Sequence, residues 1–157
     1  MKTIRAEGLC KSFDKLKVLD DISFSIQPAS VTAILGPNAS GKSTLIKSIL
    51  GLVRPDQGEI YIDDKPIRRS WEYRSRIGYM PQIARFPENL RVRELMRMVM
   101  DIRGVSEPAD GELISTFGLD ELMGRPLRVL SGGTRQKINA ALAFMFCPDI
   151  LILDEPT

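Results

Sequence analysis

The first 30 residues of the chain alternate short apolar and polar runs, as in KTIRAEG and KVLDDISFSI. Such alternation predicts half-buried antiparallel strands, with Asp20 and Asp21 as turn formers. The next run, VTAIL at residues 31–35, is continuously apolar and rich in β-branched side chains. That pattern predicts a strand that is buried on both faces.

Further along the chain, apolar residues at helical spacing predict four helices. The first helix has apolar residues at 45, 46, 49 and 50 and stops at Gly51 and Pro55, and the second has them at 95, 98, 99 and 102 and ends at Gly104. The third covers 111–117. The fourth begins after Ser131, ends at Pro148, and has on one face Ile138, Ala141, Leu142 and Met145. Short apolar runs predict three more strands, at 59–62, 77–80 and 150–153. The pattern therefore indicates an α/β protein with a helical insert at about 83–146.

Composition narrows the class of protein. The chain has 157 residues, of which 43% are apolar and 27% charged, as in one soluble globular domain. Its net charge of +2 gives no reason to expect a nucleic acid or an anionic membrane as partner. The two cysteines have no paired spacing, and the absence of histidine excludes imidazole chemistry from this chain. No leader-like segment or spanning apolar run is seen, so we expect a cytoplasmic chain.

The stretch GPNASGKST at residues 36–44 lies between the predicted strand 31–35 and the first predicted helix. It matches GxxxxGK[ST], the phosphate-binding loop (P-loop) motif, in which glycines let the backbone wrap around phosphates and the following helix N-terminus favours the anion. Lys42 would reach the β- and γ-phosphates, and the Ser43 hydroxyl would bind Mg²⁺. The alternative is a glycine turn that arose by chance. The strand–turn–helix setting favours a nucleotide, and the loop residues expected to bind it are Gly36, Pro37, Asn38, Ala39, Ser40, Gly41, Lys42, Ser43 and Thr44.

Two acids follow the last predicted strand, in ILILDEPT. A strand that ends in Asp154 holds a carboxylate rigidly near a metal ion, and Glu155 would then orient or deprotonate the attacking water. Alone, the pattern favours an ordinary strand followed by an acidic turn. In a chain that also carries a P-loop, the catalytic reading is favoured.

A third stretch, LSGGTRQK, starts at Leu130. Ser131 is a good helix N-cap, and Gly132 and Gly133 expose amides at the helix start, which makes a second candidate anion site. A capped helix with a flexible entry loop explains the same residues equally well.

Together, GPNASGKST, LSGGTRQK and ILILDEPT resemble the ATP-binding cassette (ABC) family in order and spacing, over essentially the whole chain. The resemblance implies a P-loop NTPase with a RecA-like core, an antiparallel β region and a helical signature subdomain. It implies a core and β region at 1–82 and 147–157 and a helical subdomain at 83–146. Two such domains sandwich two ATP molecules, so Ser131, Gly132 and Gly133 would bind the γ-phosphate held by a partner subunit.

The resemblance assigns further residues. Phe13 falls where the family has an aromatic ring that stacks on adenine, although a strand core residue is the plain alternative. Gln82, in YMPQ, matches the glutamine that contacts Mg²⁺ and links the site to the membrane partner; otherwise it is a polar loop residue. Thr134 departs from the family's usual glutamine. Catalysis would thus rest on Lys42, Gln82 and Glu155, with Ser43, Gln82 and Asp154 at the metal.

Members of this family continue beyond EPT with further core strands and a histidine that senses the γ-phosphate, and this sequence has neither. We therefore expect a C-terminally incomplete domain with marginal stability on its own.

The function implied by the resemblance is an Mg²⁺-dependent ATPase subunit of a membrane transporter. It would lie in the cytoplasm on the inner face of the membrane, bind a transmembrane permease subunit, and pair with a second nucleotide-binding domain, identical or paralogous. Alternatives are a translation-factor type of the same family, a nucleotide-binding module without hydrolysis, and an unrelated P-loop kinase that would have no use for LSGG. The DNA-repair type needs a long coiled-coil insertion, for which the interval between P-loop and signature is too short.

The run YMPQIARFPENLRV, with LSGGTRQK, is similar to ATPase subunits that serve copper-site maturation of nitrous-oxide reductase. The compact interval between Gln82 and Ser131 lacks the extra motif of exporters fused to their membrane helices. A separate ATPase subunit is therefore expected.

Overall fold

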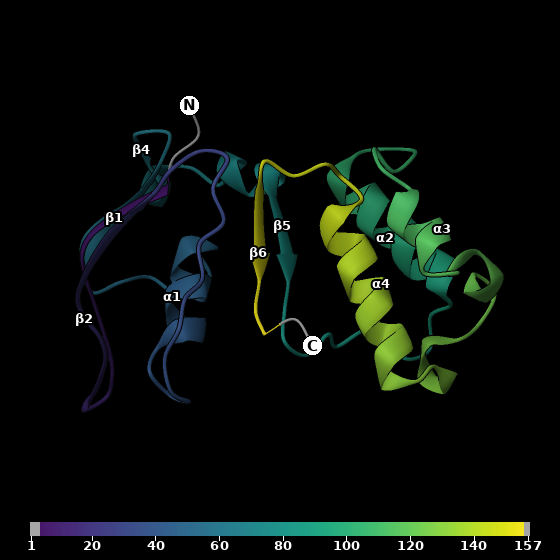
Figure 1. Cartoon of the computed structure of the whole chain (residues 1–157), viewed down its shortest axis with the longest axis horizontal. Helices are drawn as coiled ribbons and strands as arrows, with labels where there is room; N and C mark the ends of the chain where they lie inside the picture. Colours follow the sequence, from purple (N-terminus) through teal and green to yellow (C-terminus); the bar gives the residue numbers. More distant parts are fainter. Residues whose placement is uncertain (1–3, 156–157) are drawn as a thin grey trace. The chain divides into compact units, whose positions relative to one another are not determined.

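A computed structural model describes residues 4–155, so the last two residues of ILILDEPT lie outside the description. The chain divides into two compact units between Arg74 and Ser75 (Figure 1). Each unit has its own sheet, and each is described by itself.

The first unit is built on a four-stranded antiparallel sheet in the order β2-β1-β3-β4. Its strands are β1 (Ile4–Phe13), β2 (Leu16–Ile26), β3 (Gln57–Ile62) and β4 (Lys65–Pro66). One helix, α1 (Lys42–Ile49), belongs to this unit, and two short 3₁₀ segments follow the sheet, η1 (Ile67–Arg69) and η2 (Glu72–Arg76). The strands predicted within the first 30 residues are confirmed for the described part, and so are the strand at 59–62 and the first predicted helix.

Alternation explains which side chains this sheet buries. Ile4 and Ala6 of β1 and Ile60 and Ile62 of β3 are buried, because residues two apart along a strand share a face. α1 buries Leu45, Ile46 and Ile49 along one stripe.

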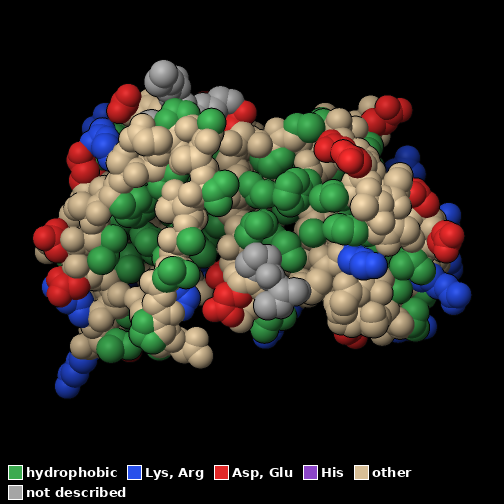
Figure 2. All heavy atoms as spheres, viewed as in Figure 1, with side chains coloured by type: hydrophobic (Ala, Val, Ile, Leu, Met, Phe, Trp, Pro, Cys, Tyr) green, Lys and Arg blue, Asp and Glu red, His purple; other side chains and the backbone are tan. Residues whose placement is uncertain are grey.

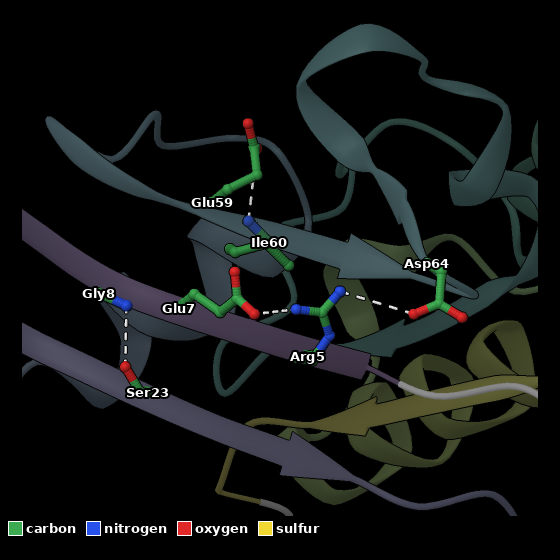
Figure 3. Close-up of polar contacts among 7 residues, drawn as sticks. All are labelled: Arg5, Glu7, Gly8, Ser23, Glu59, Ile60 and Asp64. Carbon is green, nitrogen blue, oxygen red and sulfur yellow. Dashed lines mark hydrogen bonds and ion pairs between the residues drawn. The ribbon is translucent and has the colours of Figure 1, made fainter.

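The polar side chains of the sheet pair with each other (Figure 3). Arg5 forms an ion pair with Glu7 and a second one, at 3.6 Å, with Asp64. The amide of Gly8 donates a hydrogen bond of 2.9 Å to the Ser23 hydroxyl, which ties β1 to β2 where their register shifts. These exposed ion pairs add little to the stability of the fold, since exposed ion pairs contribute about 0–1 kcal/mol each.

The predicted turn at Asp20 and Asp21 is wrong. Both residues lie inside β2, where Asp21 has a φ of 51° and the pairing with β1 is irregular. The turn lies at Asp14, whose φ is also 51°, between Phe13 and Leu16. A short acidic side chain tolerates the left-handed region, so a β-bulge and a turn use the same residue type.

The predicted buried strand at residues 31–35 is also wrong in this structure. None of these residues is in a strand, and all are exposed, with Val31 fully so and Leu35 89% exposed. A strand requires a neighbour to accept its ladder hydrogen bonds, and no strand among residues 4–155 pairs with this run. The run is as apolar as a buried strand would be, but within residues 4–155 it has no strand as its partner.

The second unit combines two parallel strands with a group of helices. β5 (Ile77–Met80) pairs in parallel with β6 (Ile150–Leu153), in a register that sets Ile77 against Ile150 and Met80 against Leu153. The helices are α2 (Val92–Arg103), α3 (Glu112–Thr116) and α4 (Gly132–Phe144), with 3₁₀ turns η3 (Asp120–Leu122) and η4 (Leu127–Val129). All the strands and helices predicted for this part of the sequence are confirmed.

The helices share a core between residues 92 and 141. Its fully or nearly buried members are Val92, Leu95, Met96, Leu119, Leu127, Ile138 and Ala141. α2 ends as expected at Gly104, whose φ of 68° makes a left-handed C-cap.

Close packing joins this helical core to the strands of the same unit. A Cβ on Gly78 in β5 would lie 2.1 Å from the Ala143 carbonyl oxygen, so only glycine lets α4 approach the strand this closely. The guanidinium of Arg103, at the end of α2, donates hydrogen bonds to the carbonyls of Ser75 and Ile77.

β6 is less buried than its apolar sequence predicts. Leu151 and Leu153 are 37% and 39% exposed, and hydrophobic side chains gather on the visible surface over β5 and β6 (Figure 2). The reason is that β6 pairs on one edge only within the described part of the chain.

Candidate functional site

The predicted P-loop lies on the surface of the first unit and leads directly into α1. Residues 36–40 are exposed, whereas Gly41, the N-cap of α1, is buried with a φ of 93°. A Cβ at Gly41 would lie 2.6 Å from the carbonyl oxygen of Val18 in β2, so a larger residue would push the loop off the sheet. Ala39 also has a positive φ, 64°. The loop therefore has left-handed backbone at Ala39 and Gly41, and glycine is needed where the loop meets β2.

Lys42 closes this loop from the helix side. Its ammonium donates hydrogen bonds of 2.9 Å to the carbonyl oxygens of both Gly36 and Pro37. The positive charge is thus held across the loop, at the N-terminus of α1, where the helix macrodipole also favours an anion. Ser43 and Thr44 follow in the first turn of α1, with Ser43 exposed.

Phe13 lies at the end of β1 and is 47% exposed, so it is not the core residue that its strand position allows. The Lys11 ammonium lies 5.3 Å from its ring centroid and forms an ion pair of 2.7 Å with Asp56. That ion pair, together with a hydrogen bond from the Ser12 amide, lowers the pKa of the Asp56 carboxyl. Half of the Phe13 side chain is therefore open to solvent, with the Lys11 ammonium over the ring.

A cavity of about 370 Å³ in the first unit lies elsewhere. Its walls include Ser48, Gly51, Trp71 and Tyr73, and no residue of the predicted P-loop lines it. The chemistry of the motifs, rather than the size of a cavity, therefore identifies the candidate site.

In the second unit, the acids predicted from ILILDEPT follow β6. Asp154 is 8% exposed, and its amide donates a hydrogen bond of 2.9 Å to the Met80 carbonyl, which extends the β5–β6 ladder by one step. The Asp154 carboxylate lies close enough to the Tyr79 phenol to act on its ionisation. Burial first, and then this carboxylate, raise the pKa of Tyr79 above its usual value. Asp154 is therefore buried at the end of β6, with its backbone bonded to β5.

Gln82 and Glu155 come together at the same edge of this strand pair. The Gln82 carboxamide nitrogen donates a hydrogen bond of 2.5 Å to the Glu155 carboxylate. Both side chains are exposed, and Glu155 has a φ of 50°. Sequence reasoning named both residues but gave no reason for them to touch, because they are separated by the whole helical insert.

The signature residues cap α4 as predicted. The Ser131 hydroxyl accepts a hydrogen bond of 3.2 Å from the Thr134 amide and lies 2.8 Å from the Thr134 hydroxyl. Around Gly132 and Gly133 there is open space, since no atom lies within 4 Å of an added Cβ. Thr134, which departs from the pattern that LSGGTRQK resembles, therefore supports the cap itself.

One residue that supports the site was missed. Asn139 in α4 is 4% exposed and donates a hydrogen bond of 2.9 Å to the carbonyl of Pro81, next to Gln82. The available signal was a lone polar residue among the apolar positions of α4.

The predicted metal ligands fit a small divalent cation. Among residues 4–155 no three acids, histidines or cysteines cluster as in an all-protein metal cage. Mg²⁺ does not require one, because it usually takes one or two carboxylates together with water and substrate phosphates. The oxygen donors of Ser43, Gln82 and Asp154 are of the type that Mg²⁺ prefers. The first of them belongs to the first unit and the other two to the second.

Comparison with known proteins decides the family. A family model described as "ABC transporter" matches residues 19–157. The chain belongs to the ABC transporter family. Its match includes all three motifs, from the P-loop through LSGG to ILILDEPT.

Two curated ABC proteins show how much of a relative the chain covers. The zinc import ATP-binding protein ZnuC of Pseudomonas syringae pv. syringae (strain B728a) is 32% identical over 153 residues, which are 98% of this chain and 55% of ZnuC. The lipopolysaccharide export system ATP-binding protein LptB of Haemophilus influenzae is 35% identical over 164 residues, 99% of this chain and 68% of LptB. The chain thus spans about half the length of ZnuC.

Solved structures agree on the fold. The ATP-binding subunit of an ABC transporter superposes with a TM-score of 0.87 at 31% identity, over 98% of this chain and 66% of that one. A nucleotide-free ATP-binding cassette gives a TM-score of 0.80 at 28% identity, over 100% and 70%. The chain therefore has the P-loop NTPase fold of ABC cassettes. No helix within residues 4–155 is both long and apolar enough to span a membrane.

The Ser131 cap can be tested through stability alone. Ser131→Ala removes the acceptor for the Thr134 amide, so we expect the free energy of unfolding of the full-length protein to fall by about 1 kcal/mol in urea titration. Ser131→Asp keeps an acceptor at the N-cap and is expected to lose less. Equal losses in the two variants would show that the hydroxyl does not cap α4.

Proposed function

We propose that the protein binds and hydrolyses ATP in an Mg²⁺-dependent reaction that powers a membrane transporter. The observation that carries the proposal is the P-loop, whose exposed residues 36–40 curl onto a helix N-terminus with the Lys42 ammonium across it. Membership of the ABC family and the relation to ZnuC and LptB, which are named as transport ATP-binding proteins, support the same conclusion.

In the proposed reaction, water attacks the γ-phosphate in line and ADP leaves. The loop amides and Lys42 bind the β- and γ-phosphates and stabilise the charge that develops on them. Bound Mg²⁺, which Ser43, Gln82 and Asp154 would hold, supplies further charge neutralisation. Glu155 orients the attacking water and accepts its proton, and Gln82, in contact with Glu155, helps to fix the carboxylate.

The remaining sequence predictions complete the proposal. Phe13 stacks on adenine, and Ser131, Gly132 and Gly133 meet the nucleotide of a second nucleotide-binding domain. Residues 83–146 act as the helical subdomain, and 1–82 with 147–157 as the core and β region. The protein acts on the cytoplasmic face of a membrane, together with a transmembrane permease subunit.

A finer proposal concerns the transporter. The run YMPQIARFPENLRV, with LSGGTRQK, favours an ATPase that serves copper-site maturation of nitrous-oxide reductase. The genes that flank the coding sequence test this assignment. Genes for nitrous-oxide reductase maturation support it, and an unrelated permease gene beside it rules it out.

Lys42→Ala tests nucleotide binding. Loss of a charge-assisted contact to phosphate is expected to weaken Mg·ATP binding by the full-length protein about 10- to 100-fold in calorimetry. Lys47→Ala is the matched control, because Lys47 is an exposed lysine in the last turn of the same helix. Equal affinities in the wild type and Lys42→Ala would overturn the assignment of the loop.

Glu155→Gln tests catalysis separately from binding. The carboxamide keeps the size of the side chain but cannot accept the proton of water, so kcat is expected to fall roughly 100-fold or more while the Kd for Mg·ATP is retained. Phosphate release measured under saturating ATP gives kcat. Normal turnover in this variant would show that another group activates the water.

A further inference from the structure

A buried polar side chain in the signature helix holds the segment that carries Gln82. Asn139 donates hydrogen bonds from Nδ2 to the Pro81 carbonyl at 2.9 Å and to the Gln136 side-chain oxygen at 3.2 Å. It is 4% exposed and lies in α4 beside Ile138, a core residue that is fully buried. A buried carboxamide has to be hydrogen bonded, and here its bonds go to one loop and one neighbour.

Gln136 strengthens the same connection. Its carboxamide nitrogen lies 3.5 Å from the Gln82 carbonyl, a long contact, while its oxygen accepts the bond from Asn139. Two residues one helical turn apart on α4 thus contact consecutive peptide carbonyls, those of Pro81 and Gln82.

From Gln82 the contacts continue to the acid. The backbone of Gln82 is next to the carbonyl that Asn139 holds, and its side chain donates the 2.5 Å hydrogen bond to Glu155. Asn139, Gln82 and Glu155 all belong to the second unit, so the chain of contacts lies within one compact body.

We propose that Asn139 is a positioning residue, which fixes the Pro81–Gln82 backbone to α4 so that the Gln82 carboxamide reaches Glu155. The inference rests on the proposed function for its effect on hydrolysis. The physical reason is that Pro81 follows the last residue of β5, where the sheet no longer restrains the chain, and Asn139 restrains it instead. An apolar residue at position 139 would fill the space without holding the loop.

The first test measures the restraint without nucleotide. Asn139→Leu keeps the branching and the number of non-hydrogen atoms of the side chain and removes both N–H donors, which leaves the Pro81 carbonyl without this partner. In the full-length protein we expect hydrogen exchange of the amides of residues 82–84 to become about 3- to 10-fold faster. Leu142→Ala is the control, because Leu142 is a residue of the same helix that packs against the helical core.

The second test separates positioning from stability. Asn139→Leu is expected to lower kcat for ATP about 10-fold with the Kd for Mg·ATP changed less than about twofold, since a misplaced group costs rate rather than binding. In a Gln82→Ala background the same substitution is expected to change kcat by less than about twofold. Asn139→Ala, a smaller residue, repeats both measurements if the leucine variant does not fold.

The outcomes are distinct. Unchanged exchange at residues 82–84 in Asn139→Leu, or a loss of kcat that is equal with and without Gln82, overturns the positioning role. If exchange is faster in Asn139→Leu but the wild-type protein hydrolyses no ATP, the restraint stands, and the proposed function is refuted together with the catalytic consequence. Faster exchange together with a kcat loss that depends on Gln82 supports the proposal.

Discussion

The parallel pairing of β5 with β6 is the constraint on which the second unit depends. Parallel strands bring their carboxyl ends to one edge, so whatever follows Met80 and Leu153 must meet there. The bond from the Asp154 amide to Met80 extends this alignment past the last strand residue. Gln82 and Glu155 are in contact because of it, although most of the unit separates them in sequence.

Stability and the proposed chemistry are carried by different residues. The helical core and the buried face of the antiparallel sheet are apolar, whereas Lys42, Gln82 and Glu155 are at least partly open to solvent. Among the described residues, Ser48, Asn139 and Asp154 are the buried polar exceptions, and each forms a hydrogen bond to a backbone carbonyl. These buried polar residues fix the position of the backbone around them through their hydrogen bonds, whereas the apolar side chains supply the packing of the core.

Much of this arrangement could be predicted from the sequence because its signals are local. Periodicity located α2 and α4, and the N-cap of α4 at Ser131 follows from its side-chain chemistry. The prediction of a strand at 31–35 is wrong because apolar composition indicates that a segment could be buried in a sheet. It does not indicate whether a neighbouring strand is present to pair with that segment. The contact of Gln82 with Glu155 and the hold of Asn139 on Pro81 depend on tertiary pairing, which no local pattern encodes.

The most direct measurement is the effect of Mg²⁺ on ATP affinity in the full-length wild type and in Asp154→Asn, by calorimetry. If the loop binds phosphate and Asp154 serves the metal, Mg²⁺ strengthens ATP binding in the wild type and much less in the variant, while the two bind metal-free ATP alike. The same Mg²⁺ effect in both proteins, or no saturable ATP binding in the wild type, would contradict this account.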